Sequence, residues 1–342
     1  MVTEAPPFWW ERPGLRAAAL VPFGFVYGRI ARRIMERRQR HAVPVPVICV
    51  GNLTVGGSGK TPTALALASA VEARGLRPGF LTRGYGGAVR HPTLVDPERH
   101  LARLVGDESM LLARRAPTVV APDRAAGAEL LVREGVDVII MDDGFQSARL
   151  IFDHAVLVVD ARRGLGNGLI FPAGPVRAPI IDQMRLADSL LVVGKGEGAD
   201  PLIRIAARAA KPVYSARLVP LQAERLHGRH WLAFAAIGDP QKFFETLRQA
   251  SVDAARTRSF GDHHHFSSEQ AAELLDEAET LSLGLVTTAK DFVRLRGGLG
   301  RVGELAEKVE VLEIDLEFDQ PEAAAAIVKQ ALKRFERRSR SA

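Results

Sequence analysis

The chain has 342 residues, a formal net charge of +6, and hydrophobic and charged fractions of 47% and 25%. These values fit a soluble globular protein with one large or two ordinary domains. A single cysteine, Cys49, excludes an intrachain disulfide and a cysteine-ligated metal site, and favours a reducing compartment. The positive charge either serves solubility or attracts an anionic partner such as nucleic acid, a phospholipid surface or a phosphorylated substrate.

Residues 1–43 differ in composition from the rest of the chain. The segment 15–35 is apolar but carries several arginines, and aromatic residues lie within and before it. Its uncharged part, residues 17–28, is too short to span a bilayer. We expect an amphipathic helix that binds a membrane surface through residues 8–40, with its arginines reaching lipid headgroups. The alternative is a helix docked on the protein's own core.

A strand, a glycine-rich turn and a helix follow one another over residues 45–63. This order is the layout of a phosphate-binding P-loop, in which Lys60 reaches the β- and γ-phosphates and Thr61 ligates Mg²⁺. Thr54 replaces the first glycine of the strict pattern, so an ordinary glycine-rich turn is the alternative. The nucleotide-binding residues expected here are Gly56, Gly57, Ser58, Gly59, Lys60 and Thr61.

Two short motifs after the P-loop can be interpreted either as functional or as purely structural. Arg83 ends the strand expected at 78–82, where it either clamps an anion or is solvated. Asp107 and Glu108 stand at the start of a helix, where acids favourably meet the helix dipole, and by themselves they indicate no more than that.

Asp142 and Asp143 follow a mostly apolar strand expected at 136–141. P-loop enzymes hold Mg²⁺ with an acid in this position. Two adjacent acids there need a cation partner, which favours a metal site over a hairpin turn. Gln146 could orient a nucleophile or the nucleotide.

Strands separated by helices over residues 45–195 predict a doubly wound, mainly parallel α/β sheet. A long glycine-rich loop at 164–174 is expected to be a functional surface loop. After the extended stretch 212–220, interpreted as a connection, a smaller α/β unit follows. We therefore expect an N-terminal helix in residues 1–43, a P-loop domain in 44–212 and a smaller domain in 213–342.

The run from Asp262 to His265 suggests a metal site at first sight. Three adjacent histidines cannot all face one ion from regular structure, and no second ligand cluster is evident. One histidine acting in acid–base chemistry between the two domains is the better interpretation.

In this order the motifs resemble those of the tetraacyldisaccharide 4′-kinase family, the lipid A kinases of Gram-negative bacteria. The resemblance covers most of the chain and includes the P-loop without its first glycine. The other matching motifs are Thr82-Arg83-Gly84-Tyr85-Gly86, Gly106-Asp107-Glu108, Asp142-Asp143-Gly144-Phe145-Gln146, Pro172-Ala173-Gly174-Pro175-Val176-Arg177 and Asp262-His263. The chain departs from the family pattern at Ser109, Ala178 and Ala289, which weakens roles for those positions and leaves the phosphate and metal positions intact.

The resemblance implies transfer of the ATP γ-phosphoryl group, with Mg²⁺, to the 4′-hydroxyl of a tetraacylated glucosamine disaccharide 1-phosphate. It implies that Asp107 accepts the hydroxyl proton with His263 as its partner, and that the domains close on ATP. It places the enzyme at the cytoplasmic face of the inner membrane. A nucleic-acid partner is not expected, because only the net charge favours one and the arginines cluster at the apolar N-terminus, and no obligate protein partner is evident from the sequence. The expected contacts to ATP or to the substrate phosphate are Lys60, Arg83, Arg124, Gln146 and Arg177. The expected metal ligands are Thr61, Glu108, Asp142 and Asp143.

Two other classes of protein remain open. A membrane-partitioning P-loop ATPase also tolerates a missing first glycine, but such proteins carry a second lysine early in the loop, where this chain has Leu-Thr-Val at residues 53–55. A nucleotide-binding adaptor without enzymatic activity gives no reason for Asp107, Asp142, Asp143 and His263 together.

Overall fold

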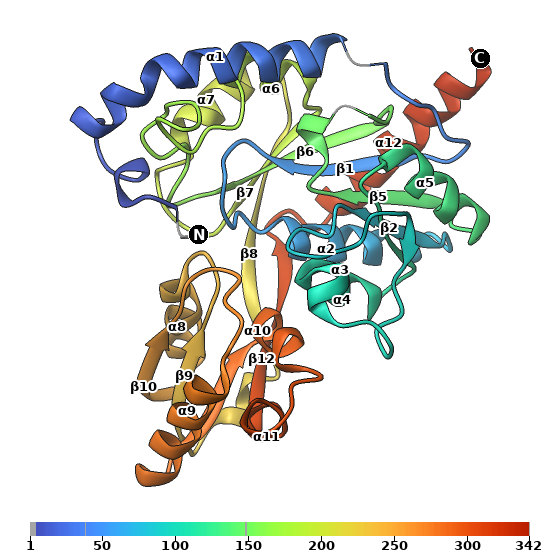
Figure 1. Cartoon of the computed structure of the whole chain (residues 1–342). Coiled ribbons are helices and arrows are strands. Elements are labelled where there is room, and N and C mark those ends of the chain that lie inside the picture. Colours follow the sequence, from blue (N-terminus) through green and yellow to red (C-terminus); the bar gives the residue numbers. More distant parts are fainter. Residues whose placement is uncertain (1–4, 38, 148, 342) are drawn as a thin grey trace.

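The computed structural model describes residues 5–37, 39–147 and 149–341. Two lobes are connected by two long neighbouring strands, β8 (Val213–Leu221) and β12 (Val309–Phe318), as Figure 1 shows. Both lobes contribute strands to one continuous set with the order β10-β9-β11-β12-β8-β7-β6-β1-β5-β2-β4-β3.

The larger lobe is built on the eight strands from β8 to β3. Within it only β3 runs antiparallel to its neighbour, which confirms the predicted doubly wound, mainly parallel sheet. Besides β8, its strands are β1 (Val47–Asn52), β2 (Pro78–Thr82), β3 (Thr93–Leu94), β4 (Thr118–Val120), β5 (Val138–Asp142), β6 (His154–Asp160) and β7 (Ser189–Val193).

Helices cover both faces of this sheet, so its central strands are buried on both sides. In β1, Val47 and Cys49 face one core while Ile48 and Val50 face the other, as the two-residue period of a strand requires. One face is covered by α1 (Leu15–Arg37), α5 (Arg124–Arg133), α6 (Ile180–Leu186) and α7 (Asp200–Arg208), and the other by α2 (Lys60–Glu72), α4 (Asp107–Ala113) and α12 (Ala323–Arg340). Short helical turns complete the lobe: η1 (Pro7–Trp9), α3 (Ala102–Val105) and η2 (Phe145–Ser147).

The smaller lobe is a second α/β layer, as expected. Its parallel strands β9, β10 and β11 join the first half of β12, and helices pack on both faces through two separate apolar cores. Its elements are η3 (Ala223–Leu226), β9 (His230–Ala235), α8 (Pro240–Gln249), β10 (Asp253–Ser259), α9 (Ser268–Thr280), β11 (Gly284–Thr288), α10 (Ala289–Leu295) and α11 (Arg301–Lys308).

The stretch 212–220, expected to be a connection, is instead a strand of the sheet. In β8, Val213 pairs with Leu190 of the parallel β7, while Leu221 pairs with Glu313 of the antiparallel β12. Most of its side chains are half-buried or exposed, so the strand has no buried face that its sequence could have revealed.

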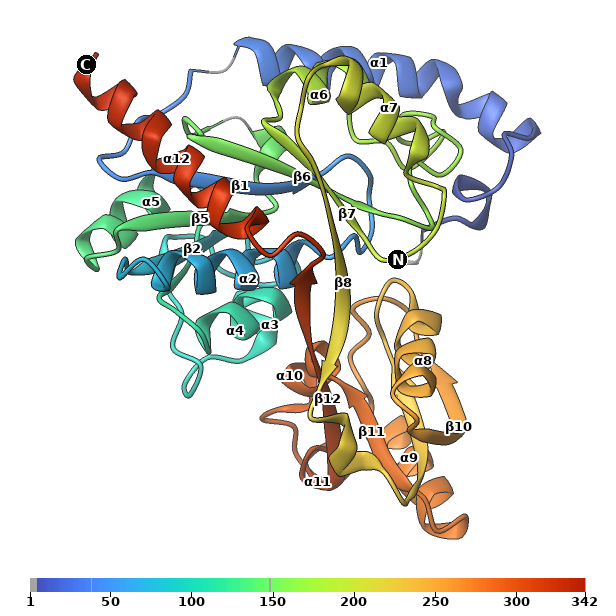
Figure 2. The same cartoon turned by 180° about the vertical axis from the view of Figure 1, so that it is seen from behind.

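The C-terminal helix α12 returns to the larger lobe, although the sequence places it after the smaller one (Figure 2). Its buried Ile327 and Val328 pack in the same core as Leu67 of α2. From the sequence, the basic stretch 333–340 is expected to be a solvated end. That expectation is wrong for Arg338, which donates to the buried Asp153 from Nε and Nη2, over 3.0 and 3.1 Å.

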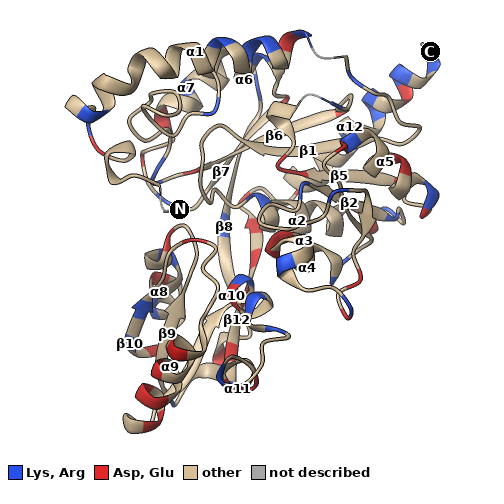
Figure 3. Ribbon diagram, in the orientation of Figure 1, with Lys and Arg blue, Asp and Glu red and all other residues tan. Residues whose placement is uncertain are grey.

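Helix α1 docks through one narrow face and leaves the other face open. Gly24 and Gly28 press against Ile170 in the glycine-rich loop, and a Cβ on Gly24 would lie 2.8 Å from the Ile170 carbonyl oxygen. Phe23 and Phe25, which lie on either side of Gly24 around the helix, are 65% and 63% exposed. Basic residues gather toward the end of the helix (Figure 3). Within the described residues, none of the helices combines the length and apolarity needed to cross a bilayer.

Candidate active site

The P-loop connects β1 to α2 at the centre of the larger sheet, where the strand order reverses direction. Gly56 and Gly59 have φ angles of +113° and +94°, which side chains other than glycine rarely adopt. Gly51 is needed for a different reason, because a Cβ there would lie 2.4 Å from the Cβ of Phe145. The Asp-Asp-Gly-Phe-Gln segment therefore packs directly on the strand that carries the P-loop.

Lys60, Asp143 and Arg177 form an ion-pair network beside the loop. The Lys60 Nζ lies 3.6 Å from Asp143 Oδ2, and Arg177 donates from its two Nη atoms to the two carboxylate oxygens over 2.6 and 3.2 Å. Burial alone would raise the pKa of Asp143, but Lys60 and Arg177 together hold it well below its usual range. Burial lowers the pKa of Lys60, which Asp143 partly opposes. Three predicted site residues thus lie together.

Asp142 and Thr61 form the second polar pair of the loop. Thr61 Oγ1 donates to Asp142 Oδ2 over 3.0 Å, while the buried Oδ1 has no partner among the described residues. Burial, reinforced by Asp143, raises the pKa of Asp142 to about 6. The buried oxygens Ser58 Oγ and Asn52 Oδ1 also lack a described partner. Orphaned hard oxygen atoms beside a P-loop fit Mg²⁺, which takes few protein ligands and keeps water and phosphate as the others.

Asp107 and His263 meet across the two lobes, 156 residues apart in the sequence. Asp107 begins α4 in the larger lobe, and His263 lies in the turn between β10 and α9 with a φ of +57°. The His263 Nδ1 lies 2.9 Å from Asp107 Oδ2, and the imidazole ring contacts the Tyr85 ring at an interplanar angle of 54°, with centroids 5.2 Å apart. This hydrogen bond raises the pKa of His263. Burial opposes ionisation of Asp107, yet His263 and Arg294 lower its pKa to about 2.

Glu108 has a cation partner in this structure. Lys290 of α10 reaches its Oε1 over 2.8 Å, and although burial opposes the shift, Lys290 lowers the pKa of the carboxyl. Glu108 therefore lies beside the site, but its partner is Lys290 of the smaller lobe, whereas the partner of Asp142 is Thr61 of the P-loop.

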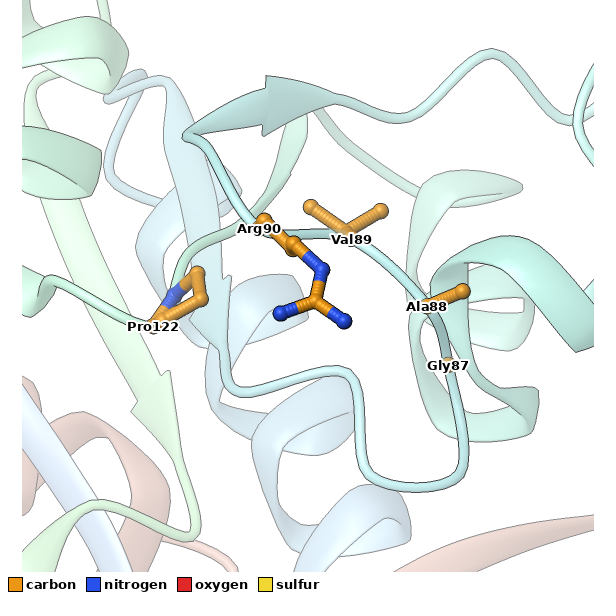
Figure 4. Close-up of a pocket in the computed structure, with 5 residues that line it drawn as sticks. All are labelled: Gly87, Ala88, Val89, Arg90 and Pro122. Carbon is orange, nitrogen blue, oxygen red and sulfur yellow. The ribbon is translucent and has the colours of Figure 1, made fainter.

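The remaining predicted arginines surround the ends of β2 and β4. The side chain of Arg124 is buried and donates to the carbonyl oxygen of Ala121, while its Nε has no partner among the described residues. Burial and the nearby Arg83 lower the pKa of Arg124 to about 10, and among the described residues neither arginine forms an ion pair with an acid. Next to them a hollow of about 390 Å³ is lined by Gly87, Ala88, Val89, Arg90 and Pro122 (Figure 4).

Gln146 has a supporting position. Its Nε2 donates to the Asn52 carbonyl oxygen over 2.7 Å and to Gln183 Oε1 over 2.9 Å. It therefore ties the end of β1 to α6. His264 is likewise occupied, since it bonds Gln270 at the start of α9. The described residues contain no cluster of three or more histidine, cysteine and acidic side chains that could hold a metal ion.

Two groups of interlobe contacts were not predicted from the sequence. Lys290 and Arg294 of α10 contact the adjacent acids of α4, and on the other side Arg162 pairs with Asp239 over 2.5 Å while Lys242 pairs with Asp160. The signal for α10 was the Thr288-Ala289-Lys290-Asp291 motif, which had no role without the fold. The second group had no motif at all.

Comparison with known proteins tests the resemblance directly. A family profile described as Tetraacyldisaccharide-1-P 4′-kinase matches residues 16–333. The chain belongs to this family. A tetraacyldisaccharide 4′-kinase from Rhizobium meliloti (strain 1021) is 58% identical over 97% of this chain and 96% of the relative. The corresponding protein from Agrobacterium fabrum (strain C58) is 54% identical over 97% and 95%. Family membership confirms the expected phosphotransferase class.

A solved structure of this kinase family has the same fold. LpxK from Aquifex aeolicus, crystallised in complex with ATP, superposes with a TM-score of 0.69 at 24% sequence identity, covering 92% of this chain and 99% of the other. The two-lobed arrangement is therefore that of the family fold.

Proposed function

We propose that this protein transfers the γ-phosphoryl group of ATP to the 4′-hydroxyl of a tetraacylated glucosamine disaccharide 1-phosphate, giving lipid IVA. The observation that carries the proposal is the convergence of the P-loop pair Lys60 and Thr61 with an interlobe acid–imidazole pair. An ATPase switch needs the first set of groups only. A kinase also needs a group that receives a proton from an acceptor hydroxyl.

The phosphate-binding part uses the loop amides and three cations. The backbone N–H groups of residues 56–59 and the start of α2 face the phosphates. Lys60 exchanges part of its contact with Asp143 for the β- and γ-phosphates. Arg177 and Arg124 balance the remaining negative charge, Arg124 with the Nε that lacks a described partner.

Asp142 and Thr61 would hold the magnesium ion, with Asp143 and Glu108 as further candidates. Mg²⁺, when bound, neutralises charge on the β- and γ-phosphate oxygens. The raised pKa of Asp142 means that its carboxylate gains most from a neighbouring cation.

Asp107 accepts the proton of the 4′-hydroxyl as the new P–O bond forms and the bond to the ADP leaving group breaks. His263 holds the Asp107 carboxylate through Oδ2. Phosphoryl transfer has a loose transition state, so orientation of the hydroxyl contributes more than a strongly basic acceptor. Because the two residues come from different lobes, the site is complete only while the lobes are in contact, as they are in this structure, and that contact excludes water from the transfer.

The open face of α1 binds the membrane that holds the acylated acceptor. Phe23, Phe25, Val26 and Ile30 enter the interface, and Arg29 and Arg33 meet anionic headgroups. The docked face, through Gly24 and Gly28, keeps the helix beside the glycine-rich loop at 164–174. The membrane is the cytoplasmic face of the inner membrane, where ATP is available.

The test is transfer of labelled phosphate from ATP to a tetraacyldisaccharide 1-phosphate, with and without Mg²⁺. Wild type should label the lipid only with Mg²⁺. Lys60→Ala should lose ATP affinity and rate, and Asp107→Ala should lose transfer but keep ATP binding. Hydrolysis of ATP without any labelled lipid would refute the kinase proposal and favour an ATPase.

The membrane part has a separate test. Binding to vesicles that contain anionic phospholipid should weaken in a Phe23→Ser/Phe25→Ser variant, while the exposed Leu281→Ser variant on the smaller lobe serves as a matched control. Equal binding by both variants would exclude α1 as the contact.

A further inference from the structure

Arg294 is the most completely enclosed cation at the lobe interface. Its side chain is 1% exposed and lies on α10, four residues after Lys290. Nε donates to Asp107 Oδ2 over 2.7 Å, and Nη2 approaches the same oxygen to 2.5 Å and His263 Nδ1 to 3.3 Å. One arginine therefore touches both members of the interlobe pair.

A second acid, Asp291, holds the Arg294 guanidinium through a nitrogen that does not contact Asp107. Asp291 is fully buried, and its Oδ1 accepts from Arg294 Nη1 over 2.8 Å. Asp291 Oδ2 accepts from the backbone N–H of Ala236 and from Thr288 Oγ1, over 3.1 and 2.7 Å. Arg294 Nη1 also donates to the Ala236 carbonyl oxygen over 2.6 Å. The guanidinium is thus held within the smaller lobe by α10 and by Ala236, the residue that follows β9, as well as by Asp107.

The contacts on Asp107 are unequally divided between its two oxygens. His263 and Arg294 both bond to Oδ2, and within the described residues no hydrogen bond is made to Oδ1. A planar carboxylate held at one oxygen by two donors from different directions has little freedom to rotate. The other oxygen is then presented in one orientation to whatever lies beside it.

We propose that Arg294 is a positioning residue for phosphoryl transfer: anchored by Asp291, it holds the Asp107 carboxylate so that Oδ1 meets the acceptor hydroxyl. This inference rests on the proposed function, and assigns to α10 a part in the reaction that the P-loop and the Asp107–His263 pair do not supply. An arginine so close makes the carboxylate a weaker base, which a reaction with a loose transition state tolerates in exchange for orientation.

The charged and titratable groups around Asp107 are consistent with this role. Glu108 lies next to it on α4, and Lys290 and Asp291 accompany Arg294 on α10. Asp262 and His263 come from the β10–α9 turn, where the Tyr85 ring contacts His263 at a tilted angle. Lys290 is engaged by Glu108, so Arg294 is the cation that serves Asp107.

Kinetic comparison of Arg294→Gln, Arg294→Lys and Arg296→Gln tests the proposal. In Arg294→Gln, kcat should fall about 100-fold while the KM for ATP changes less than about twofold, because misplacing a reacting group by about 1 Å costs this much. Arg294→Lys should recover part of kcat, since an ammonium group can reach Asp107 but cannot also span Asp291 and Ala236.

Arg296→Gln is the matched control. Arg296 also reaches across the lobes, to the Pro97 carbonyl oxygen and to Glu98, but it does not touch Asp107. Its kcat should stay within about twofold of wild type. An equal fall in Arg296→Gln and Arg294→Gln would mean that lobe contact alone matters, and would overturn the proposal.

A double variant isolates the route through Asp107. On the residual transfer by Asp107→Ala, Arg294→Gln should cause no further loss of kcat, whereas an additional 100-fold loss would show that Arg294 acts elsewhere. If Arg294→Gln does not fold, an unchanged kcat in Arg294→Lys overturns the proposal on its own. Wild type that labels no lipid at all would instead refute the proposed function.

Discussion

Asp142→Asn should stabilise the magnesium-free protein while abolishing phosphate transfer. The carboxylate is 2% exposed, and burial raises its pKa from 3.8 to about 6. A folded-state pKa above the unfolded-state value means that ionisation opposes folding. The cost is absent below about pH 4, grows between about pH 4 and 6, and is complete above about pH 6. A shift of about two pKa units corresponds to about 3 kcal/mol, which the amide variant would recover.

The assay is thermal unfolding in EDTA at pH 8 and at pH 4, with the exposed Glu313→Gln on β12 as a control. At pH 8 the melting temperature of Asp142→Asn should rise by about 5 °C, since 1 kcal/mol is worth about 2 °C in a chain of this size. At pH 4 the gain should vanish. Added Mg²⁺ with ATP should stabilise wild type more than Asp142→Asn, because the variant lacks one of the proposed metal-binding carboxylates. A variant less stable than wild type at pH 8 would refute the reasoning.

Two further predictions concern stability. Arg338→Met should lower the free energy of unfolding, measured in urea, by about 3 kcal/mol, because it leaves the buried Asp153 without its cation. The control is Arg337→Met at an exposed position, and an equal loss in both variants would contradict the ion-pair account. Gly51→Ala should lower the free energy of unfolding by about 1–3 kcal/mol in the same assay, because the new Cβ would overlap Phe145. It should also weaken ATP binding measured by calorimetry. Wild-type values for both quantities would show that the loop accommodates the methyl group without strain.

The sequence was most informative where burial is complete. The mostly apolar run His154–Asp160 predicts a strand from its sequence alone, and β6 has the same two ends because all seven residues are buried. The apolar run 45–50 also predicts a strand, but β1 begins two residues later, at Val47, and continues to Asn52 into the glycine-rich turn. The motifs and their order also predicted the family, whereas the ion pairs that join Lys60, Asp143 and Arg177 became visible only in the structure.

The sequence was least informative where contacts cross between lobes. Arg294 lies 187 residues from Asp107, and nothing local distinguishes it from other helix arginines; only the fold of α10 against α4 reveals its partner. The mixed exposure of β8 gives its sequence no strand pattern, so this strand was not predicted. The packing of α12 on α2 was not predicted either, because α12 follows the smaller lobe in the sequence. The division between residues 212 and 213 and the roles of the individual site residues stay predictions.

Strand β12 joins the strands of the two lobes through one uninterrupted backbone. Its first four residues, Val309–Leu312, pair with the parallel β11, and the next six pair with the antiparallel β8. Inserting one residue at this junction would turn every later side chain to the opposite face of the sheet. It would also rotate the smaller lobe relative to α4. We therefore expect natural and engineered length variation to be confined to surface loops such as 296–300, and to be absent from this strand, where one extra residue would separate the halves of the active site.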